Sequence, residues 1–268
     1  MTGGPTHSCE GLLELLARCF GDEEIRTALD QLPPYRRRGF RLPEKILVLL
    51  FASRAGSNFF GQLLCGTGWF NEIGESFAPH QLIKIRNRYG LGDVHDAAQW
   101  MVDNRGTPAA FGFKGGFHVL AVAAHLGLLS ESIERAHFVL LRRRDRVAQA
   151  VSGLKGKLSG RMHSLQPAGR PLSDTDYDGD AIAAQVKRIA LREAQYEEFA
   201  NRLGKPAPVH YYEDICAEPE PHVAKVCEGL GLAVPADYDP YSKVRLSVVR
   251  DELSARWAER FRSEHPEG

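Results

Sequence analysis

The chain has 268 residues, of which 43% are hydrophobic and 25% charged, so its length and composition are those of a globular protein with a substantial core. Its 34 basic and 34 acidic side chains cancel, which argues against a general affinity for nucleic acid or an anionic membrane. No apolar run approaches the roughly 18 residues of a membrane-spanning helix, and five scattered cysteines without a CxxC pair favour reduced thiols, so we expect a cytoplasmic protein without a transmembrane segment.

Residues 1–44 are expected to form an N-terminal helical extension, ahead of one domain over residues 45–268. Apolar residues recur at helical spacing in residues 10–20 and 22–32. The stretch P-P-Y-R-R-R-G-F then breaks the pattern, and its three arginines are typical of a solvated turn.

The rest of the chain alternates strands with helices, which favours an α/β fold with a central, mostly parallel sheet. An unbroken apolar run at residues 46–52 predicts a strand that is buried on both faces. Further strands are expected at residues 109–114, 136–141 and 208–215. Helices are expected at residues 58–66, 116–129, 146–156, 180–203, 220–232 and 247–262, with helical patches in residues 71–110. Residues 156–179 are rich in Gly, Ser, Pro and Asp and are expected to form a mobile loop or lid.

The loop S-R-A-G-S-N at residues 53–58 directly follows the first predicted strand, where the ligands of parallel sheets collect. The next helix would point unpaired N–H groups at this loop, Arg54 adds a guanidinium that suits phosphate or sulfate oxygens, and Gly56 lets the backbone approach a ligand. Short turns of this composition are common, so the loop alone also fits an ordinary connection. The Walker pattern GxxxxGK[ST] and the Rossmann pattern GxGxxG are both missing from it.

A second junction of the same kind follows the predicted strand at 136–141, in the stretch L-L-R-R-R-D-R-V-A-Q-A-V-S. Arg144 closes the strand, and Ser152 lies eight residues later, about two turns into the next helix. On its own the arginine run fits a solvated basic turn equally well. Together, the two junctions suit a nucleotide that carries phosphate at both ends.

These stretches resemble the motifs of bacterial sulfotransferases that use 3′-phosphoadenosine 5′-phosphosulfate (PAPS), and most closely those of the trehalose 2-sulfotransferase family. The loop at 53–58 resembles the family's T-x-R-S-G-S-T, and residues 141–152 match L-R-R-R-D-x-x-A-Q-A-V-S almost letter for letter. A later Y-D, a Y-E-D and the ending A-R-W-A-E-R-F-R extend the resemblance over roughly residues 45–262. It implies a P-loop-like three-layer sandwich that moves a sulfuryl group from PAPS to a hydroxyl of a carbohydrate or glycolipid, without a metal ion.

The resemblance also implies roles for individual residues. The residues that would hold the 5′-phosphosulfate are Ser53, Arg54, Gly56, Ser57 and Asn58, and those that would hold the 3′-phosphate are Arg144 and Ser152. Arg54 would also act in catalysis, by stabilising the charge that builds on the leaving oxygen. Glu75, in I-G-E-S-F, takes the place of the catalytic base, while His80 and His118 are competing candidates. Lys114 would meet the acceptor or a sulfate oxygen.

Several points stay open at this stage. Ala55 stands where the family has serine and Asn58 where it has threonine, so a hydroxyl contact to the phosphosulfate is lost at either position. The alternatives are a P-loop-type nucleotide-dependent kinase, which the missing lysine argues against, and an inactive nucleotide-binding scaffold. The extension over residues 1–44 has no counterpart in the family, and we expect it to cap the sheet edge, shape the acceptor pocket or contribute to a homodimer.

Overall fold

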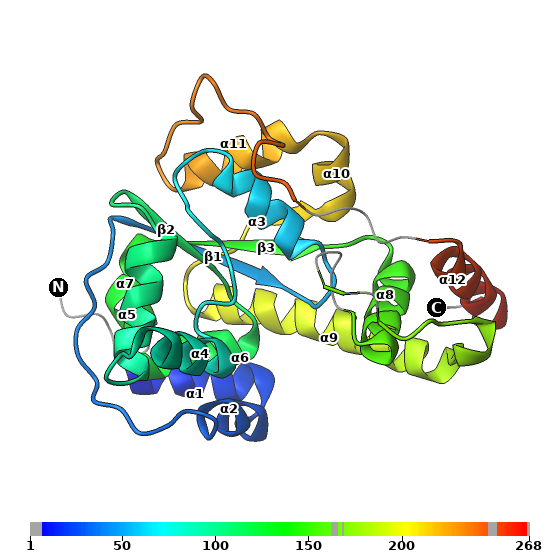
Figure 1. The fold of residues 1–268 in the computed structure, drawn as a ribbon, viewed down its shortest axis with the longest axis horizontal. Helices are drawn as coiled ribbons and strands as arrows, with labels where there is room; N and C mark the ends of the chain where they lie inside the picture. The colour runs from blue at the N-terminus through cyan, green and yellow to red at the C-terminus, as the bar shows by residue number, and fades with distance from the viewer. Residues whose placement is uncertain (1–6, 162–165, 168, 246–250, 267–268) are drawn as a thin grey trace.

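Four parallel strands form the central sheet of the computed structural model, which describes residues 7–161, 166–167, 169–245 and 251–266. The strands lie in the order β2-β1-β3-β4 and comprise β1 (Lys45–Phe51), β2 (Ala110–Lys114), β3 (Ala136–Arg142) and β4 (Val209–Tyr211). In the centre of the sheet Val48 pairs with Phe113 on one side and with Phe138 on the other. The strand order places β1, and the loop that follows it, in the middle of the molecule (Figure 1).

Strand β1 is buried on both faces, which confirms the prediction from its unbroken apolar run. Side chains on successive residues of a strand point to opposite faces. Ile46, Val48 and Leu50 accordingly belong to a first hydrophobic cluster on one face of the sheet, while Leu47 and Leu49 belong to a second cluster on the other face.

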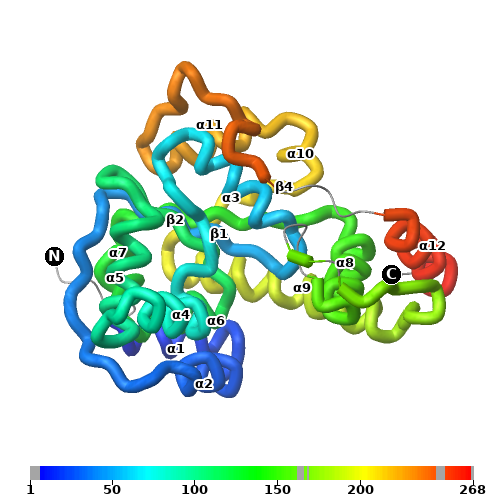
Figure 2. The backbone as a smooth tube through the Cα atoms, in the orientation of Figure 1, coloured from blue at the N-terminus to red at the C-terminus, as the bar shows by residue number. Residues whose placement is uncertain are grey.

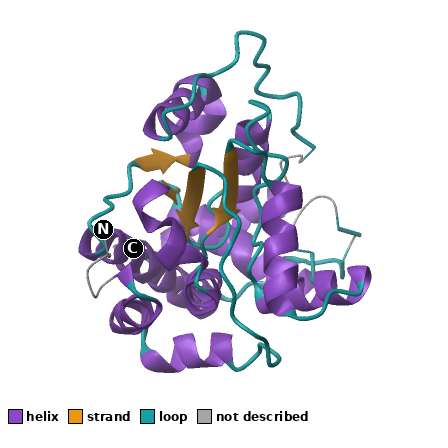
Figure 3. Cartoon of the chain, turned by 90° about the vertical axis from the view of Figure 1, so that its left-hand side faces the viewer, coloured by secondary structure: helices purple, strands orange, loops and turns teal. Residues whose placement is uncertain are grey.

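Helices cover both faces and make the three layers visible in Figures 1 and 3. The helices whose buried residues join the first cluster are α1 (Cys9–Phe20), α2 (Asp22–Leu29), α4 (Pro79–Tyr89), α5 (Val94–Arg105), α6 (Phe117–Leu126), α7 (Leu128–Ser132) and α9 (Gly179–Arg202). On the opposite face lie α3 (Ser57–Cys65), α10 (Tyr212–Ala217) and α11 (Pro219–Gly229). At one end α8 (Arg146–Ser159) and α12 (Glu252–Glu264) pack with α9 around Trp257 and Phe261.

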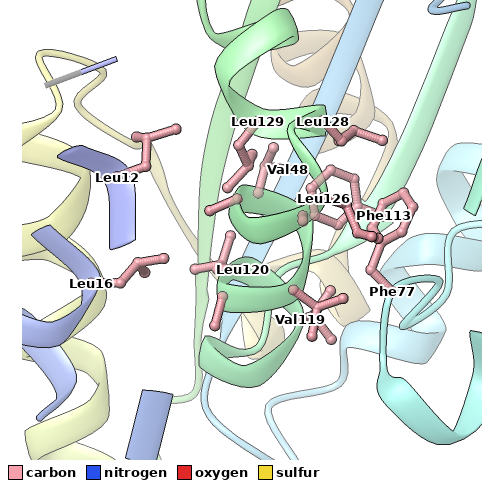
Figure 4. Close-up of a cluster of buried hydrophobic side chains, with 14 of the residues drawn as sticks. Leu12, Leu16, Val48, Phe77, Phe113, Val119, Leu120, Leu126, Leu128 and Leu129 are labelled. Carbon is pink, nitrogen blue, oxygen red and sulfur yellow. The ribbon is translucent and has the colours of Figure 1, made fainter. Parts of the chain in front are cut away.

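The two N-terminal helices are packed into the first cluster (Figures 1 and 2). Leu12 and Leu16 of α1 are completely buried, and Figure 4 shows both side chains pointing toward α6, where Leu120 lies. Ile25 of α2 is buried in the same cluster. In the arginine run that follows, Arg38 pairs with acidic side chains of the α5 start, at distances of 2.7 and 2.8 Å.

Four predicted segments differ from the structure or fall partly outside it. The single helix expected over 116–129 is divided at Gly127, which has a φ of 97°, into α6 and α7. The strand expected over 208–215 ends at Tyr211, because its pairing partner Arg142 is the last residue of β3, and the chain turns into α10 at Tyr212. The loop expected from 156 begins after Ser159, where α8 ends, and its residues 162–165 and 168 lie outside the described ones. Of the predicted C-terminal helix, α12 begins at Glu252, and residues 247–250 lie outside the described ones.

Candidate functional site

The loop between β1 and α3 lies at the carboxyl end of the sheet and is held in an unusual backbone conformation. Arg54 has a positive φ of 67°, the only non-glycine residue among the described ones to do so, and Gly56 has a φ of 92°. Residues other than glycine adopt a positive φ only at a cost in energy, and residues strained in this way are often found at functional sites. Ser57 begins α3, so the free N–H groups of its first turn face the loop.

The ring of Tyr212 packs directly against Gly56. A Cβ atom at Gly56 would lie 2.2 Å from the Cδ2 atom of Tyr212, so only glycine fits there. We expect Gly56→Ala to lower the free energy of unfolding by about 2 kcal/mol or more, since left-handed strain adds to the clash. Gly68→Ala is the matched control, because Gly68 has a φ of 77° and open space around it. Denaturant unfolding of both variants measures the difference, and equal losses would contradict the close packing at Gly56.

Helix α8 is joined to this loop by two side-chain hydrogen bonds. Gln149 donates from Nε2 to the carbonyl oxygen of Ser53 at 2.8 Å, and the Nε of Arg54 donates to the Oγ of Ser152 at 3.0 Å. The two sequence motifs, 98 residues apart at these last two positions, therefore lie side by side. Sequence reasoning had overlooked Gln149, although it stands inside the second motif.

Two guanidinium groups approach each other next to the loop. Burial first, and then the charge of Arg143, lower the pKa of Arg54. The side chain of Arg143 is 11% exposed, lies over the Tyr212 ring at 5.3 Å and has its Nε 3.7 Å from Glu213. Two positive charges in a partly buried place favour an anion. Arg143 was also overlooked, because three arginines in a row do not reveal which one points to the loop.

Arg144, which was expected to meet the 3′-phosphate together with Ser152, has other partners here. Its two terminal nitrogens donate to both carboxylate oxygens of Asp214, one of them at 2.7 Å, and its guanidinium lies 4.1 Å from the ring centre of Tyr211. This fork-to-fork geometry is the one in which arginine recognises carboxylate and phosphate alike. Arg144 is half exposed, so the guanidinium is held in a fixed place within reach of solvent.

Glu75 is fixed by a short stretch of sheet-like pairing. Gly74 forms a parallel bridge with Phe113, and the Lys114 N–H donates to the Gly74 carbonyl oxygen at 2.8 Å. The side chain of Glu75 consequently lies beside the end of β2. Its Oε1 is 3.4 Å from the Nζ of Lys114, and its Oε2 is 3.5 Å from the Nε2 of His118.

The charges around Glu75 keep it ionised. The hydrogen bond with His118, and then the positive charge of Lys114, lower the pKa of Glu75 to about 2 despite its partial burial. Burial lowers the pKa of Lys114, and Glu75 acts against that shift. Glu75 is therefore a carboxylate at neutral pH.

The two departures from the family pattern have structural explanations. The side chain of Ala55 is completely buried in the second hydrophobic cluster, where a serine hydroxyl would need a partner. Asn58 accepts a hydrogen bond from the Nζ of Lys114 through its Oδ1. Asn58 thus links the loop to the buried lysine.

A pocket of about 610 Å³ opens beside these residues, between α3 and the start of α4. Asn58, Glu75 and Lys114 line one part of it, and His80 also contributes. His80 lies next to Gln81, with 3.2 Å between their side-chain nitrogens, and no hydrogen bond or ion pair among the described residues joins its side chain to that of Glu75. This volume is in the range of small-molecule sites.

No group of three or more His, Cys, Asp or Glu side chains in the described ranges has an arrangement that would hold a metal ion. Among the helices that the structure describes, none is long and apolar enough to cross a membrane.

Comparison with known proteins identifies a family whose model matches the sequence. A model of the Stf0 sulphotransferase family matches residues 120–264, more than half of the chain. None of the curated proteins compared matches the sequence. Among solved structures, the chain is similar to the sulfotransferase domain of the Synechococcus PCC 7002 olefin synthase, at 17% identity and a TM-score of 0.47, covering 86% of this chain and 92% of that one. The family match includes the second motif with Arg144 and Ser152, and the loop at 53–58 lies ahead of it.

Proposed function

This chain belongs to the Stf0 sulphotransferase family, and from that premise we propose that it moves a sulfuryl group from PAPS to a hydroxyl group of a carbohydrate or glycolipid, in the cytoplasm. The observation that carries the proposal is the position of Lys114. Its ammonium group contacts Asn58 of the loop on one side and Glu75 on the other. One cation therefore joins the expected donor end of the site to the expected base.

In this reaction Glu75 accepts the proton of the attacking hydroxyl. The hydroxyl oxygen forms a bond to sulfur while the bond between sulfur and the bridging phosphate oxygen breaks, so the electron pair leaves on 3′,5′-adenosine bisphosphate. Arg54 and Lys114 stabilise the negative charge that builds on the departing oxygen and the sulfuryl group. As Lys114 turns toward that charge, Glu75 loses part of the field that lowers its pKa and becomes a stronger base.

At the other end of the donor, Arg144 and Ser152 bind the 3′-phosphate. Asp214 and Tyr211 hold the Arg144 fork in the free protein, so a phosphate binds there by sharing or displacing the carboxylate. Ser152 is held against the loop through Arg54. The contact between the two motifs supports one continuous donor site along β1 and β3.

The acceptor side is polar. Amide side chains recur in the pocket lining, which includes Asn58, Gln62, Asn71 and Gln81. Amides donate and accept hydrogen bonds at once, which suits neighbouring hydroxyls of a sugar. Lys243 and Arg245 add positive charge to the lining.

Calorimetry with two nucleotides tests the donor assignment. We expect 3′,5′-adenosine bisphosphate to bind tightly without magnesium, because the site offers arginines and loop N–H groups in place of a metal. A clear preference for ATP with Mg²⁺ would overturn the proposal in favour of a kinase. Slow hydrolysis of PAPS by the protein would exclude an inactive scaffold.

A further inference from the structure

The first turn of α6 is held by a hydroxyl from another helix. Gly116 precedes α6 and offers no side chain to cap it, so the first N–H groups of the helix need other acceptors. The N–H of Phe117 donates to the Oη of Tyr196, on α9, at 3.0 Å. Tyr196 is 3% exposed, so this bond is shielded from water.

An aromatic and cationic stack surrounds the same point. The Phe117 ring stacks on Phe20, at the end of α1, with 6.0 Å between ring centres. The Arg192 guanidinium lies 4.3 Å from the Phe117 ring centre and 5.7 Å from that of Phe20. Arg192 also donates to both carboxylate oxygens of Glu24 on α2. Since the Arg192 side chain is only 16% exposed, its cation–π contacts are partly desolvated and correspondingly stronger.

The residue next to Phe117 is His118, whose Nε2 lies 3.5 Å from the Oε2 of Glu75. The rings of Phe117 and His118 meet edge to face at 5.4 Å. A shift of Phe117 therefore moves the imidazole that faces Glu75. Burial above all raises the pKa of Tyr196, and the charge of Glu75 adds to that rise.

We propose that Tyr196 and Arg192 are positioning residues, which hold the start of α6 so that His118 stays against Glu75, and that the N-terminal helices take part through Phe20 and Glu24. The inference rests on the proposed role of Glu75 as the base. It gives residues 1–44 a function in the reaction, because their helices α1 and α2 hold the start of α6, which orients the catalytic carboxylate.

The test uses the full-length protein, with PAPS and whichever hydroxyl acceptor the wild type sulfates. Tyr196→Phe removes the hydroxyl that accepts from Phe117 and keeps the ring. We expect kcat to fall roughly threefold to tenfold, the size of one hydrogen bond, while the Kd for 3′,5′-adenosine bisphosphate is unchanged. Arg192→Lys keeps the charge but loses the planar stack, and should lower kcat in the same way.

The pH profile separates positioning from a merely structural role. The groups that face Glu75 are Lys114 from β2 and His118 from α6, and a looser His118 lets the pKa of Glu75 rise from about 2 toward its ordinary value near 4.5. The acidic fall of kcat/KM should therefore move to higher pH in Tyr196→Phe, because the base must be ionised. The fall of kcat at neutral pH comes from the lost orientation of Glu75 and not from its basicity.

Tyr238→Phe is the matched control, since it also removes one partly buried hydroxyl bond, to the carbonyl oxygen of Leu63 on the opposite face of the sheet. An unchanged kcat in Tyr196→Phe would overturn the inference. A second outcome would also overturn it: kcat falls only in proportion to the melting temperature, as in Tyr238→Phe, and the acidic limb of the pH profile does not move. A wild-type protein that binds the bisphosphate but transfers no sulfuryl group would instead refute the proposed function.

Discussion

Replacing Glu75 with glutamine is expected to lower kcat by about 10²–10⁴-fold, the usual contribution of a positioned base. Glutamine keeps the size of the side chain and a hydrogen-bond acceptor for Lys114, but it cannot take the proton of the attacking hydroxyl. The Kd for 3′,5′-adenosine bisphosphate should stay within a few-fold of the wild type, because the proposed site assigns Glu75 to the acceptor, whereas Asn58, on the donor loop, is a separate contact of Lys114. Steady-state kinetics with labelled PAPS and calorimetry measure the two quantities.

Two further variants make this result specific. Glu44→Gln removes an exposed carboxylate whose partner is Lys45, at the far end of β1, and should leave kcat unchanged. His118→Asn tests the competing base. If Glu75→Gln retained activity and His118→Asn lost it, the proton would be going to the imidazole, and Glu75 would serve to orient it.

Replacing Arg144 with alanine is expected to weaken the binding of 3′,5′-adenosine bisphosphate by about 10- to 100-fold, which corresponds to the loss of a hydrogen bond to a charged group. The loss of affinity should exceed the contribution of the guanidinium hydrogen bonds, since the unpaired carboxylate of Asp214 would then repel the phosphate. Adenosine 5′-phosphate lacks the 3′-phosphate, so its affinity should change little. Calorimetry with both nucleotides measures the ratio.

Lys157→Ala provides the charge-matched control for Arg144→Ala. Lys157 is an exposed cation near the end of α8, five residues or about one and a half turns beyond Ser152, so its loss reports the change in net charge. Equal losses of affinity for the two nucleotides in Arg144→Ala would contradict its assignment to the 3′-phosphate and would direct attention to Arg143.

Most strands of this fold could be predicted because a buried strand is a short run of apolar residues, which is visible in the local sequence. An apolar run such as that of β1 is stable in water only when both faces are covered, so residues 46–52 predicted a central strand without knowledge of its neighbours. The end of β4 could not be predicted in this way. Whether Tyr212 continues the strand depends on how much of β3 remains to pair with, and on the space above Gly56.

The candidate site was only partly predictable, for a related reason. Gly56 and Arg54 stand out because backbone geometry and charge act locally. The joining of Glu75 to Lys114 depends on the bridge between Gly74 and Phe113, which links segments that are 39 residues apart. No local pattern contains such a contact.

The N-terminal helices show the same limit. Helical spacing in residues 10–20 predicted α1 well, since one stripe of leucines must be buried. That spacing does not say which surface covers the stripe. The stack of Phe20 on Phe117, and the reach of Arg192 to Glu24, appear only when α1, α2, α6 and α9 are brought together (Figure 2).

The central claim is sulfuryl transfer from PAPS, and a transfer assay with ³⁵S-labelled PAPS tests it most directly. The acceptor panel should contain neutral sugars, acidic sugars, glycolipids and phenols, with wild type and Glu75→Gln run in parallel. The account predicts that label moves from PAPS to a hydroxyl of a carbohydrate or glycolipid, with one equivalent of 3′,5′-adenosine bisphosphate released, and that Glu75→Gln abolishes most of this transfer. Transfer to none of these acceptors, together with tighter binding of ATP and Mg²⁺ than of the bisphosphate, would contradict it.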